Sequence, residues 1–532
     1  MTSLAHLLLL ATILTPLALL ATAVTERGRA RLPGLLAYAP LPGLCAAVIA
    51  GDAPPLVIYA DWLRLSLGLD APGALLLGVA ALLWSAAGAY ASACLPGAKR
   101  FAGWWLLTLA GSLGVFVAGD LVTFYFAFAL VSLAAYGLVV HDATARARRA
   151  GAIYLALAVL GEVFLLFAFA LLAVSIPGES LAIADAVAAL PNAPLRDVTI
   201  LLLLLGFGLK AGLVPLHVWL PLAHPAAPMP ASAVLSGAII KAGIIGLIRF
   251  LPFEGGIAGW GTALGALGLL TAFYGVALGV TQRNPKTILA YSSVSQMGVV
   301  MAALGFGLAA GDAGTPLDAA RYASHHVLAK GALFLGVGVA LATGARRAAW
   351  VMAPVLLLAL SFGGLPFSGG ALAKEATKAQ LGAGVLGWLS ALSAAGTTML
   401  MLHFAARLRA GFAESSEARA GLGLILPFAV MTAAALLLPW WLYAAPVNLW
   451  PALWPVLLGA LGFLALRAFE ARLPRPPEGD LLVFAEAAAS RIAPPLAARA
   501  ARIESRLRAW PSAGLALLGL LLALILAMAL AA

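Results

Sequence analysis

The chain has 532 residues, of which 63% are hydrophobic and 10% charged, and its formal net charge is +11. A mean hydropathy of +1.03 excludes a soluble protein, because its surface would hold too few polar groups to cover it. The basic balance does not predict nucleic-acid binding, since no basic stripe with interleaved aromatic residues is present. Two isolated cysteines, Cys45 and Cys94, are too few for a disulfide framework or an iron–sulfur cluster.

Apolar segments of about 20 residues, the length that a helix needs to cross a bilayer, recur along the whole chain. Helices are the default for such segments because lipid offers no partners to backbone polar groups. We count about sixteen. The first, residues 3–24, has no Lys or Arg before Arg27, so we interpret it as a retained helix rather than a cleaved signal. The sequence predicts an all-α polytopic membrane protein.

Charged residues between the predicted helices alternate in sign. Acidic residues lie in the connections after even-numbered helices, and basic clusters follow odd-numbered ones: Arg27, Arg29 and Arg31; Lys99 and Arg100; Arg146, Arg148 and Arg149; Arg283 and Lys286; Arg346 and Arg347. By the positive-inside rule, the odd-numbered helices end in the cytoplasm and both termini face outside. The net charge therefore reflects topology, and we expect a multi-pass protein of a bacterial or archaeal cell (inner) membrane.

The organisation along the chain is a helical bundle followed by a tail. We expect helices 1–3 in residues 1–100, a five-helix unit in 101–250, a second five-helix unit in 259–408, helices 14 and 15 in 421–467, a cytoplasmic basic amphipathic segment in 468–511 and a final transmembrane helix in 512–532. The segment 468–511 fits a helix at the interface or against a neighbouring subunit, and equally a solvated connector.

Two of the predicted helices are interrupted. Pro215 breaks the seventh shortly after Lys210, and the Gly- and Pro-containing stretch 363–370 breaks the twelfth shortly before Lys374. Broken helices free backbone groups beside which transporters place ion sites. Because the two breaks are five helices apart, the two five-helix units have opposite orientations. Such an inverted repeat is typical of transporters.

Five lysines lie inside long apolar stretches: Lys210, Lys241, Lys330, Lys374 and Lys378. A cation near the bilayer centre costs about 3 kcal/mol even on the gentlest scale, so it is rarely kept without a partner and a purpose. A buried lysine can change between charged and neutral forms when a carboxylate partner approaches or leaves, whereas arginine cannot. The pattern indicates movement of charge or protons across the membrane.

Several of these residues also have a simpler interpretation. Lys241 and Lys330 fit structural partners of backbone carbonyls at broken helices, and Lys378 fits a side chain that extends to the outer interface. Glu375 fits either a counter-ion of Lys374 or Lys378 or a member of a pathway. His217 and His224 fit either a proton-uptake role or a helix-capping role at the cytoplasmic end of the seventh helix.

Four stretches with polar residues in a fixed order resemble a known family: 206–250, 283–298 (RNPKTILAYSSVSQMG), 325–335 (HHVLAKGALFL) and 364–375 (GLPFSGGALAKE). They are similar to the antiporter-like subunits shared by respiratory complex I, Mrp-type cation/proton antiporters and group-4 membrane-bound hydrogenases. The resemblance covers about the fourth to the thirteenth helix. It implies a row of buried ionisable groups along the membrane midplane.

On this resemblance, the proton pathway would comprise Glu162, Lys210, Lys241, His326, Lys330, Lys374 and Glu375. The chain departs from the family in its fifth helix, where Ala129 stands in place of the glutamate that pairs with the Lys210 equivalent. We hypothesise that Glu162, in the sixth helix, is the carboxylate partner of Lys210 instead.

The resemblance implies a proton-translocating subunit of an oxidoreductase complex, with no redox or hydrolytic site, cofactor or metal of its own. Its expected partners are other membrane subunits, among them hydrogenase or quinone-reductase subunits, with protons or else sodium as the transported ion. Alternatives are an Mrp-type antiporter subunit, a proton-gradient-coupled module of an inorganic-carbon uptake complex, and a structural subunit that no longer conducts.

Overall fold

The computed structural model describes residues 2–508, without 52, 61–62, 96, 177–179, 413–416 and 470–471, and after them residues 515, 518–519 and 521–522. It divides into two compact units, Met1–Glu478 and Gly479–Ala532. The second unit contains α22 (Leu481–Arg508), within the predicted amphipathic segment. Most of the helix predicted over 512–532 lies outside the described residues.

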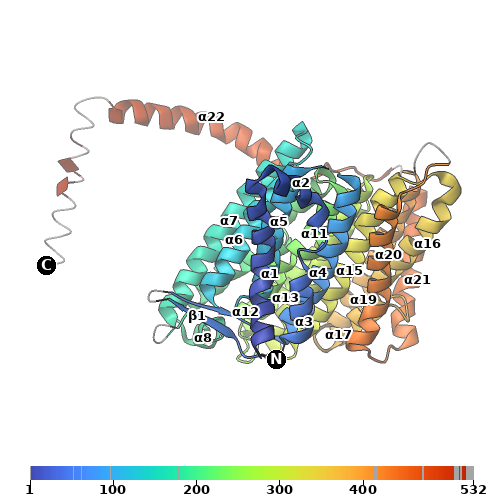
Figure 1. The fold of residues 1–532 in the computed structure, drawn as a ribbon, viewed down its shortest axis with the longest axis horizontal. Helices are drawn as coiled ribbons and strands as arrows, with labels where there is room; N and C mark the ends of the chain where they lie inside the picture. The colour runs from blue at the N-terminus through green and yellow to red at the C-terminus, as the bar shows by residue number, and fades with distance from the viewer. Residues whose placement is uncertain are drawn as a thin grey trace. The chain divides into compact units, whose positions relative to one another are not determined.

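The first unit is a bundle of helices that run side by side (Figure 1). Its N-terminal half contains α1 (Thr2–Ala21), η1 (Thr22–Val24), α2 (Glu26–Leu35), α3 (Leu41–Ile49), β1 (Leu56–Ala60), β2 (Leu63–Leu67), α4 (Ala71–Cys94), α5 (Lys99–Val117), α6 (Leu121–Val139), α7 (Ala145–Ser175), α8 (Ile183–Ala189), η2 (Leu190–Asn192), α9 (Arg196–Ala211), η3 (Leu216–Val218), α10 (Trp219–Ala226), α11 (Met229–Val234), η4 (Leu235–Ile239) and α12 (Lys241–Phe250). The second half contains α13 (Ala258–Gly279), α14 (Pro285–Ala310), α15 (Thr315–Leu341), η5 (Ala345–Arg347), α16 (Ala348–Gly363), α17 (Gly369–Ala376), α18 (Lys378–Leu381), α19 (Gly384–Arg409), α20 (Leu422–Tyr443) and α21 (Leu449–Phe469).

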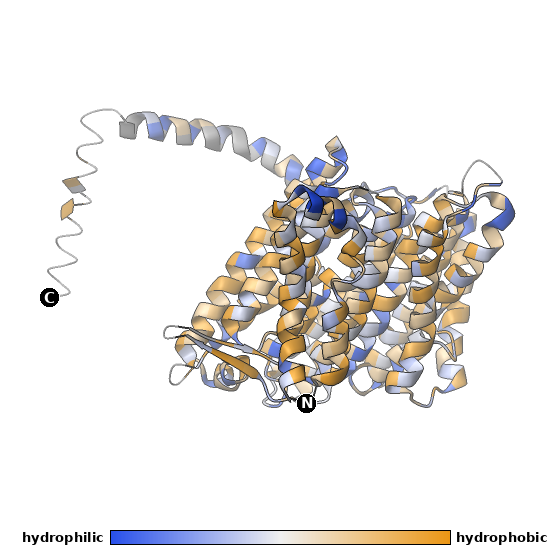
Figure 2. Cartoon of the chain, in the orientation of Figure 1, coloured by the Kyte–Doolittle hydropathy of each residue, from blue (hydrophilic) through white to orange (hydrophobic). Residues whose placement is uncertain are grey.

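Fourteen segments of the described residues are long and apolar enough to cross a membrane. Apolar residues cover most of their length in Figure 2. The predicted number of about sixteen is not confirmed. Between α1 and α4 the chain forms two helices of 10 and 9 residues, α2 and α3, each shorter than the about 20 residues of a span. Pro40, the residue before α3, lacks a backbone N–H and separates the two helices.

Both predicted breaks are confirmed, and both use the same backbone conformation. The first half-helix, α9, ends at Gly212 with φ +88°, and Pro215 follows before α10. The other, α16, ends at Gly364 with φ +94°, and Pro366 follows before α17. Glycine adopts this left-handed conformation without steric penalty, and its N–H closes the last helical turn.

Two features were not predicted from the sequence. Residues Leu235–Ile239 form a π-helical turn, η4, one residue before α12 begins at Lys241. Isolated π turns are frequent at functional sites, and they leave no trace in a hydropathy pattern because they change the hydrogen-bond register rather than the composition. The loop between α3 and α4 contains an antiparallel hairpin, in which Leu56 of β1 pairs with Leu67 of β2.

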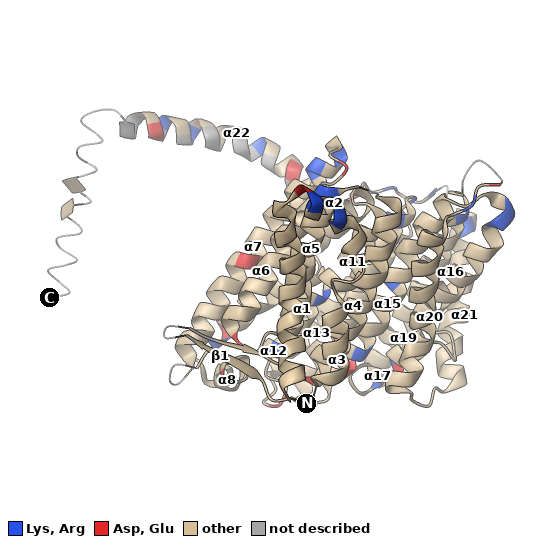
Figure 3. Ribbon diagram, viewed as in Figure 1, with Lys and Arg blue, Asp and Glu red and all other residues tan. Residues whose placement is uncertain are grey.

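Charged residues gather at the two ends of the bundle, and few lie between them (Figure 3). The end that carries α2 is basic, with Arg27, Arg29 and Arg31 exposed to solvent. The hairpin of β1 and β2 lies at the opposite end (Figure 1). This separation of charge follows the alternation seen in the sequence.

The side chain of Arg249, at the end of α12, joins three elements at the hairpin end. Its guanidinium donates to both carboxylate oxygens of Asp70, at 2.8 and 3.1 Å. It also donates to the carbonyl oxygens of Val115, Phe116 and Ala118, which α5 leaves without partners at its C-terminus. Arg249 is 7% exposed, and its five bonds fix α12 relative to α4 and α5.

Contact between α9 and α12 depends on a second glycine position. A Cβ atom added to Gly243 would lie 2.4 Å from the carbonyl oxygen of Phe207 and 3.1 Å from the Cβ of Lys210. The absent side chain therefore allows α12 to approach the helix that carries Lys210. Lys241 lies only two residues before Gly243, so this contact also sets the position of the second lysine.

We expect Gly243→Ala to destabilise the protein by about 1–3 kcal/mol, because the methyl group overpacks the contact between α9 and α12. Thermal unfolding of the purified protein in detergent measures the change. Gly259→Ala, near the start of α13, is the matched control, since an added Cβ there meets nothing within 4 Å. Equal effects of the two substitutions would contradict the close packing at Gly243.

Arg249→Met should lower the free energy of unfolding by about 3 kcal/mol or more, since it leaves Asp70 and three carbonyl groups without their partner. Arg196→Met is the control, because Arg196 forms an exposed ion pair with Asp197 that contributes little. Burial raises the pKa of Asp70, but the Arg249 guanidinium outweighs it, and the pKa lies below the ordinary value of 3.8. A depressed carboxyl pKa stabilises the fold above pH 3.8, so we expect this contribution to disappear as the pH falls below that value. An unfolding midpoint with the same acid dependence in wild type and Arg249→Met would contradict this account.

Candidate functional site

Lys210, in the last turn of α9, is buried and has neutral partners. Its ammonium donates to the Ser132 hydroxyl at 2.9 Å and to the Tyr154 hydroxyl at 3.3 Å. The ammonium also lies 5.7 Å from the centre of the Phe128 ring, a distance typical of a cation–π contact. The Tyr154 hydroxyl in turn donates to the Ser132 carbonyl at 2.7 Å. Neither Ser132 nor Tyr154 was identified from the sequence, because single hydroxyl groups in apolar helices carry no pattern.

Glu162, on α7, is the residue that the sequence analysis proposed as the carboxylate partner of Lys210. Its side chain is buried, and neither carboxylate oxygen accepts a hydrogen bond from the described residues. It interacts electrostatically with Lys210 but forms no ion pair with it within 4.0 Å among those residues. The carboxylate therefore acts on Lys210 through space, and the direct pair remains a hypothesis.

Lys241 and His326 are in direct contact. The Lys241 Nζ lies 3.0 Å from the His326 Nδ1, and both residues have no exposed surface. Lys241 follows the π turn η4, and His326 lies in the middle of α15. His326 Nε2 has no hydrogen-bond partner among the described residues.

Lys330 lies one helical turn after His326 on α15. Its ammonium donates to the carbonyl oxygen of Leu289 at 2.8 Å and lies 5.3 Å from the centre of the Phe362 ring. A backbone carbonyl and an aromatic face stabilise a cation without supplying a negative charge. Lys330 thus binds a backbone carbonyl, as the structural interpretation predicted. The carbonyl belongs to Leu289 in α14, however, and not to either broken helix.

The other histidine of the pair, His325, faces the second broken helix. Its Nε2 lies 3.2 Å from the hydroxyl of Ser361 in α16, and the same hydroxyl accepts the backbone N–H of Gly370 in α17 at 3.1 Å. The adjacent residues His325 and His326 thus contact different parts of the site. His325 binds across the break, and His326 binds Lys241.

A chain of hydrogen bonds runs between α14, α15 and α19 near Lys374. The Tyr322 hydroxyl donates to the side-chain oxygen of Gln296 at 2.9 Å, and the Gln296 amide donates to the hydroxyl of Thr397 at 3.0 Å. The Lys374 ammonium lies 6.0 Å from the centre of the Tyr322 ring. Neither Tyr322 nor Thr397 was identified from the sequence.

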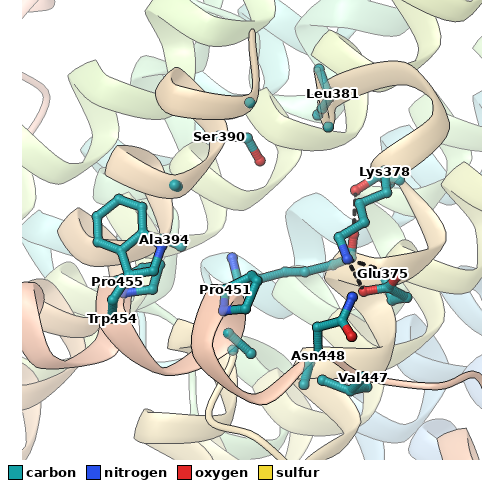
Figure 4. A pocket seen from close by; sticks show the side chains of 18 of the residues that line it. Glu375, Lys378, Leu381, Ser390, Ala394, Val447, Asn448, Pro451, Trp454 and Pro455 are labelled. Carbon is teal, nitrogen blue, oxygen red and sulfur yellow. Dashed lines mark hydrogen bonds and ion pairs between the residues drawn. The ribbon is translucent and has the colours of Figure 1, made fainter. Parts of the chain in front are cut away.

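Lys374 is half-buried and lines a cavity of about 410 Å³, together with Glu375 and Lys378. Figure 4 shows Glu375 and Lys378 facing one another beside Asn448 in this cavity, and their charged atoms lie 2.7 Å apart. The counter-ion role of Glu375 toward Lys378 is thus observed in the structure. Other walls come from the end of α16, from α18, and from α19 and α21, where Trp388 and Trp454 lie against each other.

Two more histidines, His217 and His224, lie in the segment that follows the first break. His217, in η3, is fully buried, and its ring lies 5.0 Å from that of Tyr274. His224, in α10, is also fully buried, and its ring lies 5.1 Å from that of Phe334. Both rings are enclosed, and the choice between a proton-uptake role and a capping role stays a prediction.

Together these contacts form a row of basic side chains through the interior of the bundle. Lys210 begins it at the first broken helix, the pair of Lys241 and His326 continues it, and Lys330 follows one turn away. Lys374 ends the row at a cavity beside the second broken helix. Among the described residues, none of the three fully enclosed lysines forms an ion pair within 4.0 Å, and no group of three or more potential metal ligands occurs. The three enclosed lysines therefore have no fixed counter-ion in this part of the chain.

Known proteins are similar to this chain in sequence and in fold. The sequence model of the NADH:quinone oxidoreductase/Mrp antiporter transmembrane family matches residues 118–400, which is more than half of the chain. The hydrogenase-4 component B of Escherichia coli K12 is 29% identical over 346 residues, covering 60% of this chain and 51% of that protein. NADH-quinone oxidoreductase subunit N of Desulforudis audaxviator is 34% identical over 281 residues, covering 51% of this chain and 54% of that protein.

The putative antiporter subunit mnhA2 of Staphylococcus epidermidis is 32% identical over 302 residues, covering 52% of this chain and 37% of that protein. The alignments thus span about half of these relatives or less. A chain of the Mrp complex from Dietzia sp. DQ12-45-1b has a TM-score of 0.72 at 22% identity, over 99% of this chain and 63% of its own. A chain of the membrane-bound sulfane sulfur reductase, an archaeal respiratory membrane complex, has a TM-score of 0.74 at 20% identity, over 98% and 100%. The fold is shared with both structures, and the extent of the family match establishes that this chain belongs to the NADH:quinone oxidoreductase/Mrp antiporter transmembrane family.

Proposed function

We propose that this chain moves protons across a membrane along the row of buried basic residues, as one subunit of a multi-subunit membrane complex. The contact of Lys241 with His326 is the observation that carries the proposal. A 3.0 Å contact between two nitrogens needs one hydrogen and one free lone pair. The pair therefore cannot hold both groups fully protonated, and it shares a proton between them.

His326 is suited to pass that proton onward. An imidazole with a proton on one nitrogen accepts a second on the other and then releases the first. One ring nitrogen contacts Lys241, and the other is buried and has no hydrogen-bond partner among the described residues. Lys330 lies one turn later on the same face of α15. Lys241, His326 and Lys330 thus provide successive proton donors and acceptors along this part of the row.

The two ends of the row differ in their access to solvent. Lys210 is enclosed by Ser132, Tyr154 and Phe128, whereas Lys374 opens into the cavity that also contains Glu375 and Lys378. Water in that cavity can exchange protons with Lys374, and the acidic and basic side chains beside it keep the wall polar. We infer that protons enter or leave the row at Lys374.

The chain supplies no energy source that the sequence reveals, so a partner must provide it. We propose that the partners are other membrane subunits, with hydrogenase or quinone-reductase subunits supplying redox energy. We also propose a cell (inner) membrane location with the basic end of the bundle in the cytoplasm. Purification of the tagged chain from its own membranes, followed by identification of co-purifying subunits, tests the partner proposal.

Cation/proton antiport is the second candidate function. The similarity to a chain of the Mrp complex extends over 99% of this chain and supports it. In that case the proton gradient is the energy source, and only small antiporter-type subunits co-purify.

A structural subunit that no longer conducts is the third candidate, because Ala129 removes one carboxylate from the pathway and Lys210 has neutral hydrogen-bond partners.

Replacing either end of the row should stop conduction. We expect Lys210→Ala and Lys374→Ala each to lower the proton flux of the co-purified, reconstituted complex by about a hundredfold, the contribution of a positioned proton-transfer group. A pH-sensitive dye inside the liposomes records the flux. Lys99→Ala is the control, since Lys99 is exposed at the start of α5. Wild-type flux in both variants would rule out conduction along this row.

Glu162→Gln tests the carboxylate separately. It keeps the shape of the side chain but removes the charge that acts on Lys210, so Lys210 is protonated less readily. We expect coupled proton transport to fall at least about tenfold, because the pathway loses the carboxylate that favours the charged form of Lys210. Thermal unfolding should change little, because neither oxygen accepts a hydrogen bond from the described residues. Unchanged transport in Glu162→Gln would show that Lys210 works without this carboxylate.

A further inference from the structure

A small cavity lies at the basic end of the bundle, and no residue of the row from Lys210 to Lys374 lines it. Its volume is about 180 Å³, and it lies between the start of α5, the end of α6 and the loop that leads to α7. The opposite end of α5 lies at the hairpin, because Ala118 pairs with Leu67 at the end of β2. Two arginines in one small cavity favour an anionic ligand. The polar residues that line the cavity are Arg100, Trp104, Tyr136, His141 and Arg148.

The polar groups of this cavity have no partners within the described part of the chain. Arg100 and Arg148 form no hydrogen bond and no ion pair with any described residue. The indole N–H of Trp104 and the hydroxyl of Tyr136 also form no hydrogen bond with these residues. By contrast, Arg146, two residues before Arg148, forms an ion pair with a glutamate. The cavity therefore offers donors from four side chains that the described residues leave unused.

The aromatic walls of the cavity are held by packing. A Cβ atom added to Gly137 would lie 2.1 Å from Cγ of Trp104, so the indole ring packs directly on the backbone of α6. The His141 ring lies 5.0 Å from the ring of Phe101 in α5. These contacts fix the walls before any ligand binds. A preformed site loses less conformational freedom on binding than a mobile one.

The charge around the cavity also favours an anion. No carboxylate is among the described residues that line it. Asp142, which follows His141 in the chain, does not line it and interacts electrostatically with Lys286. The first turn of α5, which carries Arg100, has no side-chain cap, so the positive end of its dipole is not compensated by an acidic group. A negative ligand would thus meet no fixed negative charge on the described walls.

The size of the cavity limits the anion to a small group. Pockets that enclose a drug-sized molecule measure roughly 300–1,000 Å³, and this cavity is smaller. A nucleotide, with its base and sugar, would extend beyond it. A single phosphate is small, and guanidinium groups bind phosphate oxygens through pairs of parallel hydrogen bonds. The lining and the volume therefore suit one phosphate group.

An exposed apolar face of α6 leads into the cavity. Phe126 and Leu133, seven residues apart on one face of α6, are both exposed in this chain. Tyr136 and Val140 continue the same face, three and seven residues after Leu133, and both line the cavity. Trp and Tyr are enriched where membrane-spanning helices meet the water boundary. A basic cavity at the end of an apolar stripe suits a phospholipid, which carries a phosphate above its acyl chains.

We propose that this cavity binds the phosphate of an anionic phospholipid headgroup, with Arg100 and Arg148 as its charged ligands. The Tyr136 hydroxyl and the Trp104 indole N–H donate further hydrogen bonds, and one acyl chain lies along the exposed face of α6. Basic pockets between membrane-spanning helices recognise anionic headgroups through the same chemistry. This inference does not rest on the proposed function, because it involves none of the residues of the row.

The test uses the complex that co-purifies with the tagged chain, washed in neutral detergent and titrated with phosphatidylglycerol. Native mass spectrometry counts the bound lipids and gives the apparent Kd of the tightest one. We expect the double variant Arg100→Gln/Arg148→Gln to raise this Kd at least about tenfold, the effect of losing charge-assisted hydrogen bonds. Arg29→Gln/Arg31→Gln is the matched control, because it removes the same charge from exposed positions of α2 at the same end. Its Kd should stay within about twofold of wild type, and equal effects of the two double variants would overturn the site.

A second variant tests the site without changing its charge. Tyr136→Phe keeps the ring that packs in the cavity wall and removes only the hydroxyl. We expect the apparent Kd for phosphatidylglycerol to rise about threefold, as for the loss of one neutral hydrogen bond. The midpoint of thermal unfolding without added lipid should match that of wild type. An unchanged Kd in Tyr136→Phe would overturn the placement of the phosphate in this cavity.

Two further results distinguish the lipid from other occupants. Glycerol phosphate carries the same phosphate without acyl chains, and we expect a hundredfold excess of it to leave phosphatidylglycerol bound. Displacement of the lipid by glycerol phosphate would identify a soluble anion as the ligand and overturn the lipid assignment. If a partner subunit covers the cavity instead, the wild-type complex will retain no more phosphatidylglycerol than Arg100→Gln/Arg148→Gln does, and the proposal is then wrong.

Discussion

The contact between Lys241 and His326 sets the constraint on which the rest of this structure depends. Two basic groups meet at 3.0 Å in a fully buried position, and a carboxylate forms no ion pair with Lys241 among the described residues. A permanently charged pair at that distance would repel and would also lack solvation. The arrangement is stable only when at least one of the two groups is neutral.

Backbone carbonyl groups supply partners to two of the other buried cations. Lys330 binds a carbonyl of α14, and Lys286 binds the carbonyl of Ala227 just after α10 ends. In lipid such carbonyl groups are available only where a helix ends, bends or accepts an additional bond. The Ala227 carbonyl lies at such a helix end, and the Leu289 carbonyl, inside α14, also accepts the Ser293 hydroxyl at 3.0 Å.

Both broken helices end in a left-handed glycine, but the lysines beside the two breaks have different surroundings. In α9 the lysine comes before the break and is enclosed by hydroxyl and aromatic groups. In α17 the lysine comes after the break and lies in a cavity beside an ion pair. Gly364 is needed for this second arrangement, because an added Cβ would lie 2.7 Å from the Lys374 side chain. The row of basic residues therefore has an enclosed end at Lys210 and an end at Lys374 that lines a cavity.

Much of this molecule follows from local properties of the sequence. Hydropathy identified the membrane helices, and Gly and Pro marked both breaks, since these residues act on their own backbone. Isolated lysines in apolar stretches marked the positions of Lys210, Lys241, Lys330 and Lys374, because a buried charge is conspicuous wherever it occurs. The short helices α2 and α3 were missed, since hydropathy alone does not report a turn before Pro40.

Only the tertiary structure decided which groups touch. Lys241 and His326 are 85 residues apart in the chain, and Lys210 and Ser132 are 78 apart. Their contacts depend on a π turn that shifts one helix and on Gly243, which lets two helices approach, and neither leaves a periodic signal. The sequence therefore determined where charge is buried, and packing decided whether each charge meets a hydroxyl, a carbonyl or an imidazole.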